Sequence, residues 1–257
     1  MRKNMFRLLS VLVLIAVMPT AVHAASGNNS WYVKRNGTSR PGFPSDAEDL
    51  REYECYFIDD EAAARGEQKL YITFDAGYEN GNVARILDVL RDEDVPAAFF
   101  LLDNIIMKNT DLVVRMADEG HLVCNHTKRH KNLASADSGT IAKELSELED
   151  IYREYTGREM ARYFRFPEGT YSKEAVAEVC RLGYKTVFWS FGYEDWDNAR
   201  QPSAAYAKNK ILSNTHDGAV ILLHPTSATN ADILRDLIRE WRQMGYSFGT
   251  LDELTAK

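Results

Sequence analysis

The chain has 257 residues and a formal net charge of −7 at pH 7. This length is enough for one large α/β domain with a substantial core. An acidic chain is a poor partner for nucleic acid or an anionic membrane surface, so neither is expected to bind here.

The first 24 residues have the pattern of a secretory signal peptide. Three basic residues precede an apolar run from Leu8 to Met18, and Val22-His23-Ala24 resembles a small-residue cleavage site. The run is short for a membrane span, so we expect export with cleavage near Ala24, and a membrane anchor only if the segment stays uncleaved. Cleavage would remove the three basic residues and change the net charge from −7 to −10.

Residues 25–67 are polar and contain several Gly and Pro residues, which predicts an N-terminal extension. From residue 68 to 257, strand-like and helix-like segments alternate, which indicates one domain with a mostly parallel sheet covered by helices. This pattern is typical of an α/β fold, either an open sheet or a (β/α) barrel, complete or incomplete. Strands are expected at 70–74, 97–102, 121–124, 163–166, 185–189 and 219–223, and helices at 82–93, 138–155, 172–183 and 229–245.

The three cysteines are an odd number for an exported chain and do not suggest a disulfide framework. Cys124 lies two residues before His126, but its place in an apolar run predicts a buried strand cysteine.

Ionisable residues follow five of the predicted strands. Each has an ordinary structural explanation by itself, such as a helix cap or a satisfied core histidine. Five such clusters at five strand ends are harder to explain by packing, because buried charges are costly without partners. The residues concerned are Asp75, the pair His126 and His130, Arg165 with Glu168, Asp195 with Trp196, and His224.

The segments TFDAGYEN, HTKRH, RFPEG, EDW and LLH, in this order, resemble the motifs of the polysaccharide deacetylases with a NodB homology domain, carbohydrate esterase family 4. The resemblance covers about Lys69 to the C-terminus. It is strongest to the N-acetylmuramic acid deacetylases of the PdaA type, which act on peptidoglycan and prepare muramic δ-lactam in the spore cortex. The resemblance implies a distorted (β/α) barrel and hydrolysis of an N-acetyl group on a cell-wall glycan strand.

The resemblance also implies a role for each site residue. Asp75 would be the general base and His224 the general acid. Arg165 would orient Asp75, and Asp195 would pair with His224. His126 and His130 would bind a divalent metal, with Zn²⁺ expected because imidazole suits it. The substrate-binding residues would be Glu168, through a nearby backbone N–H, and Trp196 and Leu222, which would line the pocket for the acetyl methyl group.

The sequence departs from the family pattern at three positions. Ala76 stands where most members carry a second acid that binds the metal, although PdaA-like members also lack it. Gly192 stands where many relatives have Asp, and Glu168 where Tyr is common. The metal shell would then need water, substrate or Asp75, with Glu79 a weaker candidate.

Three functions remain open from the sequence: a muramic acid deacetylase, a deacetylase of chitin-like or poly-N-acetylglucosamine chains, and a carbohydrate-binding pseudoenzyme. For muramic acid, Lys128, Arg129 or Arg162 is a candidate partner of the lactyl carboxylate. If stem peptides must be removed first, an N-acetylmuramoyl-L-alanine amidase would be a functional partner. A monomer is expected.

Overall fold

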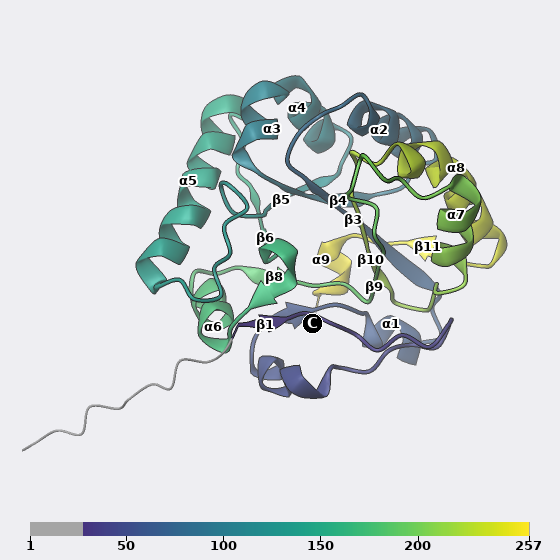
Figure 1. Cartoon of the computed structure of the whole chain (residues 1–257), viewed down its shortest axis with the longest axis horizontal. Helices are drawn as coiled ribbons and strands as arrows, with labels where there is room; N and C mark the ends of the chain where they lie inside the picture. Colours follow the sequence, from purple (N-terminus) through teal and green to yellow (C-terminus); the bar gives the residue numbers. More distant parts are fainter. Residues whose placement is uncertain (1–27, 257) are drawn as a thin grey trace, which may run out of the picture.

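The computed structural model describes residues 28–256, so the predicted signal peptide lies outside the described part. Its centre is a nine-stranded sheet with the order β2-β8-β6-β5-β4-β3-β10-β9, and β11 pairs with β3. Every pairing within this sheet is parallel. The sheet curls into a partial barrel surrounded by helices (Figure 1). Its strands are β2 (Cys55–Tyr56), β3 (Lys69–Ala76), β4 (Ala97–Leu101), β5 (Leu122–Asn125), β6 (Ala161–Phe164), β8 (Lys185–Val187), β9 (Phe191–Gly192), β10 (Val220–Leu223) and β11 (Ser247–Phe248).

The six predicted strands are all present, and the expected distorted barrel is confirmed. Boundaries differ at residues of interest. Strand β6 ends at Phe164, before Arg165, and β8 ends at Val187, before Trp189. Strand β3 does not end at Phe74, because Asp75 and Ala76 still pair with Phe100 and Leu101 of β4. Asp75 is therefore held by the sheet rather than by a loop, which restricts its backbone.

Helices cover the sheet where the sequence is amphipathic. Apolar side chains of β3 and β4 pack against those of α2, α4 and α8 in the largest hydrophobic cluster. Gly183 and Gly245, the glycines expected near helix C-termini, both have a positive φ, 83° and 96°. The helices are α1 (Asp60–Ala64), α2 (Asn82–Asp92), α3 (Asp103–Lys108), α4 (Thr110–Asp118), α5 (Ser138–Thr156), α6 (Lys173–Arg181), α7 (Ala204–Leu212), α8 (Ala228–Gln243) and α9 (Leu251–Leu254), with 3-10 helices η1 (Ser45–Glu52) and η2 (Pro167–Gly169).

The N-terminal segment, residues 28–58, packs on the domain. Its β1 (Asn29–Ser30) pairs antiparallel with β7 (Thr170–Tyr171), and its β2 extends the main sheet beside β8. In Figure 1 this purple and blue segment crosses beneath the sheet, beside β8 and β9. Trp31 is 6% exposed and packs in a second hydrophobic cluster with Phe57 and Phe188. The extension thus contributes both a strand and core side chains.

All three cysteines are free thiols, and Cys124 is buried in β5 as predicted. Within residues 28–256, no helix is long and apolar enough to cross a membrane.

Candidate active site

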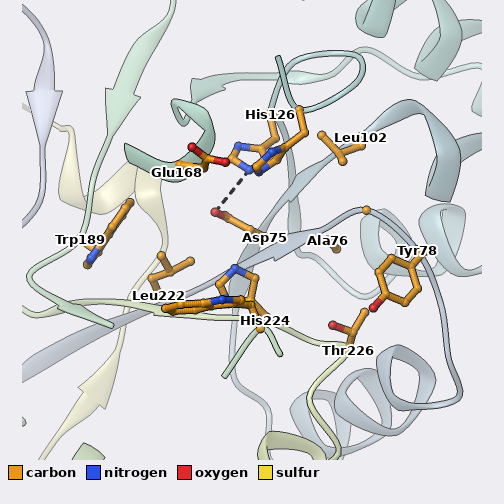
Figure 2. Close-up of a pocket in the computed structure, with 13 residues that line it drawn as sticks. Asp75, Ala76, Tyr78, Leu102, His126, Glu168, Trp189, Leu222, His224 and Thr226 are labelled. Carbon is orange, nitrogen blue, oxygen red and sulfur yellow. Dashed lines mark ion pairs between the residues drawn. The ribbon is translucent and has the colours of Figure 1, made fainter. Parts of the chain in front are cut away.

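Side chains at the carboxyl ends of the parallel strands converge on a cavity of about 620 Å³. This is the edge at which α/β proteins place their ligands, because the loops that follow the strands meet there. Figure 2 shows Asp75 in the middle, with His126 and Glu168 on one side and His224 on the other. The lining residues are Asp75, Ala76, Gly77, Tyr78, Leu102, His126, His130, Glu168, Trp189, Trp196, Leu222, His224 and Thr226.

Asp75 is fixed by Arg165, which directly follows β6, the strand two places along the sheet from β4. The Arg165 guanidinium is fully buried and donates to Asp75 Oδ1 at 2.7 Å. The same guanidinium donates to Thr73 Oγ1 at 2.8 Å and to the Val187 carbonyl at 2.9 Å, so its orientation is determined by the barrel. Burial alone would raise the pKa of Asp75, but the charge and hydrogen bond of Arg165, together with the neighbouring histidines, outweigh burial and lower it. Asp75 is therefore a carboxylate at neutral pH.

His126 faces the other oxygen of Asp75. Its Nε2 lies 3.5 Å from Asp75 Oδ2, the contact drawn as a dashed line in Figure 2. Its Nδ1 lies 2.9 Å from the Arg165 carbonyl oxygen. A carbonyl can only accept, so Nδ1 carries the hydrogen and the lone pair of neutral His126 is on Nε2. Burial lowers the pKa of His126 to about 4 despite the nearby charge of Asp75, so the ring is neutral at neutral pH.

His130 returns to the same place because the loop after β5 folds tightly. Thr127 and His130 both adopt a positive φ, 67° and 58°, which is uncommon outside glycine. Asn125 Oδ1 accepts from the Thr127 backbone N–H at 2.9 Å and stabilises this turn. As a result the His126 and His130 rings lie 5.0 Å apart, centroid to centroid.

The side chains of His126 and His130 supply part of a ligand set for the metal expected from the sequence. Among residues 28–256, no three His, Cys, Asp or Glu side chains form a group that could hold a metal ion. The two adjacent imidazoles do fit as a partial ligand set, since His126 presents its lone pair toward the cavity while a backbone carbonyl fixes its tautomer. Ala76 adds no donor atom.

His224, directly after β10, is held by a buried carboxylate. Asp195 is fully buried, and its Oδ1 lies 2.7 Å from His224 Nδ1. Its Oδ2 accepts from the His224 backbone N–H at 2.8 Å and from Asn230 Nδ2 at 2.6 Å. Burial opposes a charge on His224, but Asp195, with Asp75 further away, outweighs burial and raises the pKa of His224.

Known proteins resemble this chain in sequence and in structure. The family model for polysaccharide deacetylase matches residues 62–187. Peptidoglycan-N-acetylmuramic acid deacetylase PdaA from Bacillus subtilis is 34% identical over 229 residues, which cover 88% of this chain and 85% of that protein. The chain belongs to the polysaccharide deacetylase family.

Two solved structures of carbohydrate esterase family 4 have a similar fold to this deacetylase. The solved structure of Bacillus subtilis PdaA, a family 4 carbohydrate esterase, superposes with a TM-score of 0.83 at 33% identity, covering 88% of this chain and 96% of that one. A family 4 pseudoenzyme from Bacillus anthracis superposes with a TM-score of 0.68 at 25% identity, covering 74% of this chain and 66% of that one.

The predicted substrate-binding residues of this deacetylase all line the cavity. Leu222 is nearly buried in β10, and Trp196 is 57% exposed with its ring 6.0 Å from that of His224. Glu168 is exposed and adopts a left-handed conformation at φ 58°. Leu222 and Trp196 give the cavity apolar surface on the side of His224.

The structure brings together all nine predicted site residues. Seven of them line the cavity, Asp195 is paired with His224, and Arg165 is paired with Asp75. It does not bring the three candidate lactyl partners there. Lys128 forms an ion pair with Glu147, Arg129 with Asp103 and Arg162 with Glu149, and none of the three lines the cavity. Glu79 also lies outside the lining, and its carboxylate accepts from the Gly81 backbone N–H.

Sequence reasoning missed Trp189, Tyr78, Leu102 and Thr226 as lining residues. Trp189 ends the apolar run KTVFW, where an aromatic residue predicts core packing. A usable signal was nevertheless present, because Trp189 follows β8, which lies beside β6, the strand that Arg165 directly follows.

Proposed function

We propose that this deacetylase removes the N-acetyl group from N-acetylmuramic acid in peptidoglycan, leaving an amine that can close on the lactyl carboxyl group to form muramic δ-lactam. One observation carries the hydrolytic part: an Arg-paired carboxylate and an Asp-paired histidine face one cavity from opposite walls. The muramic acid part is supported by the similarity to PdaA, whose name specifies that substrate.

Asp75 would act as the general base. Hydrolysis of an acetamide needs a water molecule that loses its proton as it attacks the carbonyl carbon. Asp75 is ionised and its Oδ1 is occupied by Arg165, which leaves Oδ2, on the side of His126, to accept that proton. The arginine thus fixes which oxygen is available.

His224 would act as the general acid. The departing sugar amine needs a proton, because an amide anion is a poor leaving group. With Nδ1 bound to Asp195, only Nε2 of His224 can deliver a proton to the cavity. The raised pKa of His224 keeps the ring protonated to higher pH than an ordinary histidine.

A divalent metal, with Zn²⁺ the proposed ion, would be held by His126 and His130. When bound, such an ion polarises the acetyl carbonyl and makes water more acidic. The backbone near Glu168 would assist by donating to the developing oxyanion. Leu222 and Trp196 would receive the acetyl methyl group and exclude water from it.

The runner-up functions differ in substrate or in chemistry. A deacetylase of chitin-like or poly-N-acetylglucosamine chains would use the same catalytic groups. One relative, from Listeria monocytogenes, is named peptidoglycan-N-acetylglucosamine deacetylase PgdA. It is 29% identical over 195 residues, which cover 74% of this chain and 40% of that protein. A pseudoenzyme is favoured by Ala76 and by the solved relative of that type. Against it, all four proposed proton-transfer and orienting groups are present and paired.

The biological setting is proposed from the same resemblance. The signal-like N-terminus supports export to a wall-facing location. We also propose that the enzyme is a monomer and has a role in the spore cortex. If the lactyl group must be free for lactam closure, an N-acetylmuramoyl-L-alanine amidase would act before this enzyme.

The proposal is tested by mass spectrometry of muropeptides. Purified peptidoglycan is treated with the enzyme, with and without prior amidase digestion, and a chitin oligomer is treated in parallel. We expect loss of acetyl from muramic acid, larger after amidase treatment. Loss of acetyl from glucosamine alone would reject the muramic acid assignment, and no loss from any glycan in the presence of Zn²⁺ would favour the pseudoenzyme.

A further inference from the structure

Trp189 forms a wall of the cavity that no catalytic role explains. It follows β8, is half-buried, and lies beyond Asp75 between Glu168 and Leu222 (Figure 2). We propose that Trp189 is a sugar-binding surface and that Trp31 and Arg35 of the N-terminal segment hold it in position. The inference rests on the proposed function, because it assigns the sugar-binding side of the same site.

Trp31 joins the two loops that frame this wall. Its indole N–H donates to the Trp189 carbonyl at 2.8 Å, and its ring stacks on Phe188 at 4.2 Å with an angle of 9°. Its backbone N–H donates to the Gly169 carbonyl at 2.8 Å, immediately after Glu168. One residue of the N-terminal segment therefore fixes the loops of both Trp189 and Glu168.

The Trp189 ring packs directly on backbone at Gly169. This glycine has φ +64°, and a Cβ there would lie 2.7 Å from Trp189 Cη2 and 3.2 Å from Trp31 Cβ. No side chain fits without displacing an indole. The distance between the Glu168 loop and the Trp189 indole is thus set by van der Waals contact at Cη2 and Cζ2.

Arg35 holds the opposite side of the same wall. Its Nη1 donates to the Gly192 carbonyl at 2.8 Å, and its guanidinium lies 5.2 Å from the centre of the Phe191 ring. A Cβ on Gly192 would lie 3.3 Å from the Trp189 ring and 3.5 Å from Leu222 Cβ. Arg35 itself is exposed, so it acts through this backbone contact and contributes little to the core.

The composition of the cavity explains why an indole wall matters. Among residues 28–256, no Lys or Arg lines it, whereas Tyr78, Trp189 and Trp196 supply large aromatic faces. Such faces bury the apolar C–H surface of a sugar ring at low entropic cost. The tilt of Trp189 would therefore set how tightly the sugar binds, while Asp75 and His224 set the rate of hydrolysis.

The test uses full-length W31F and R35A variants and a matched control, R40A. W31F keeps an aromatic ring beside Phe188 but removes the N–H that reaches the Trp189 carbonyl, together with part of the ring surface. Arg40 also fastens the N-terminal segment, through the carbonyls of Asp59 and Asp217, but it does so away from the cavity. The probe is a peptide-free peptidoglycan tetrasaccharide, its Kd is measured by titration calorimetry, and kcat is measured at saturation.

We expect W31F and R35A to raise Kd by about three- to tenfold, the effect of losing one hydrogen bond, with kcat within about twofold of wild type. R40A should bind like wild type. Unchanged Kd in both variants, no binding by wild type, or an equal loss in R40A would overturn the inference. If wild type binds the glycan but releases no acetate, the proposed function fails, whereas weaker binding by W31F and R35A would still support this inference.

Discussion

At the scale of single residues, two aspartates of the site have different partners and so different uses. Asp75 is paired with a permanently charged arginine, which keeps it ionised and leaves one oxygen free. Asp195 is completely buried, and its oxygens are used by His224 and Asn230. It can therefore influence catalysis only by controlling the charge and direction of His224.

The pairing of Asp195 with His224 predicts where activity is lost at alkaline pH. Asp195 is what raises the pKa of His224 against the effect of burial, so Asp195→Asn should lower that pKa. The general acid works in its protonated form and is lost as pH rises through its pKa. The alkaline limb of the pH–kcat profile should therefore move to lower pH, while the acid limb, set by Asp75, stays in place.

Asp197→Asn is the matched control, because Asp197 pairs with Arg200 on the same loop and does not contact His224. An alkaline limb that does not move in Asp195→Asn, or that moves equally in Asp197→Asn, would contradict the role given to Asp195.

The residue at position 76 is predicted to affect the affinity of the site for a metal ion. It is 1% exposed, lines the cavity beside Asp75 and offers no donor atom. Ala76→Asp would add an anionic oxygen where two imidazoles are available, so Zn²⁺ affinity should increase. Competition with a chelator measures this directly, and Ala76→Asn provides a control of similar size without the charge. Equal Zn²⁺ affinity in wild type and Ala76→Asp would show that the metal does not bind beside this position.

At the scale of elements, the sequence predicted the site because parallel strands end at one edge. Five apolar runs end in ionisable residues, and in a parallel sheet those ends must meet. Periodicity also predicted α2, α5, α6 and α8. It could not predict β9, which has two residues and pairs with β10.

The roles of Trp31 and Trp189 were also beyond the sequence. Trp189 lies in an apolar run typical of core residues and Trp31 in the polar N-terminal segment, and only the fold brings that segment against the loop after β8. The turn that carries His130 was equally hidden, because a threonine and a histidine with positive φ give no signal comparable to a glycine.

At the scale of the whole molecule, the N-terminal segment completes the domain. Its β2 covers the edge of β8, and Phe57 and Trp31 pack on Phe188 and Phe166 in the second hydrophobic cluster. Removing it would expose an unpaired parallel edge and a group of aromatic side chains, both of which promote aggregation.

We therefore expect a chain that begins at Asn28 to be soluble and one that begins at Gln68 to aggregate or melt at a clearly lower temperature. Soluble yield and thermal unfolding of the two truncations check this. If the chain from Gln68 is soluble and melts at the same temperature, residues 28–67 are a separate appendage.

The central claim is that Asp75 and His224 hydrolyse an acetamide from opposite walls of one cavity. Acetate release from amidase-treated peptidoglycan, measured with Zn²⁺ for wild type, Asp75→Asn, His224→Gln and His121→Gln, tests it most directly. His121 is a matched control, because it is buried before β5, at the end of the sheet away from the cavity. We predict that the first two variants lose roughly 10²–10⁴-fold in kcat and bind the glycan like wild type, while His121→Gln stays active. A kcat near that of wild type in Asp75→Asn or His224→Gln would contradict the account.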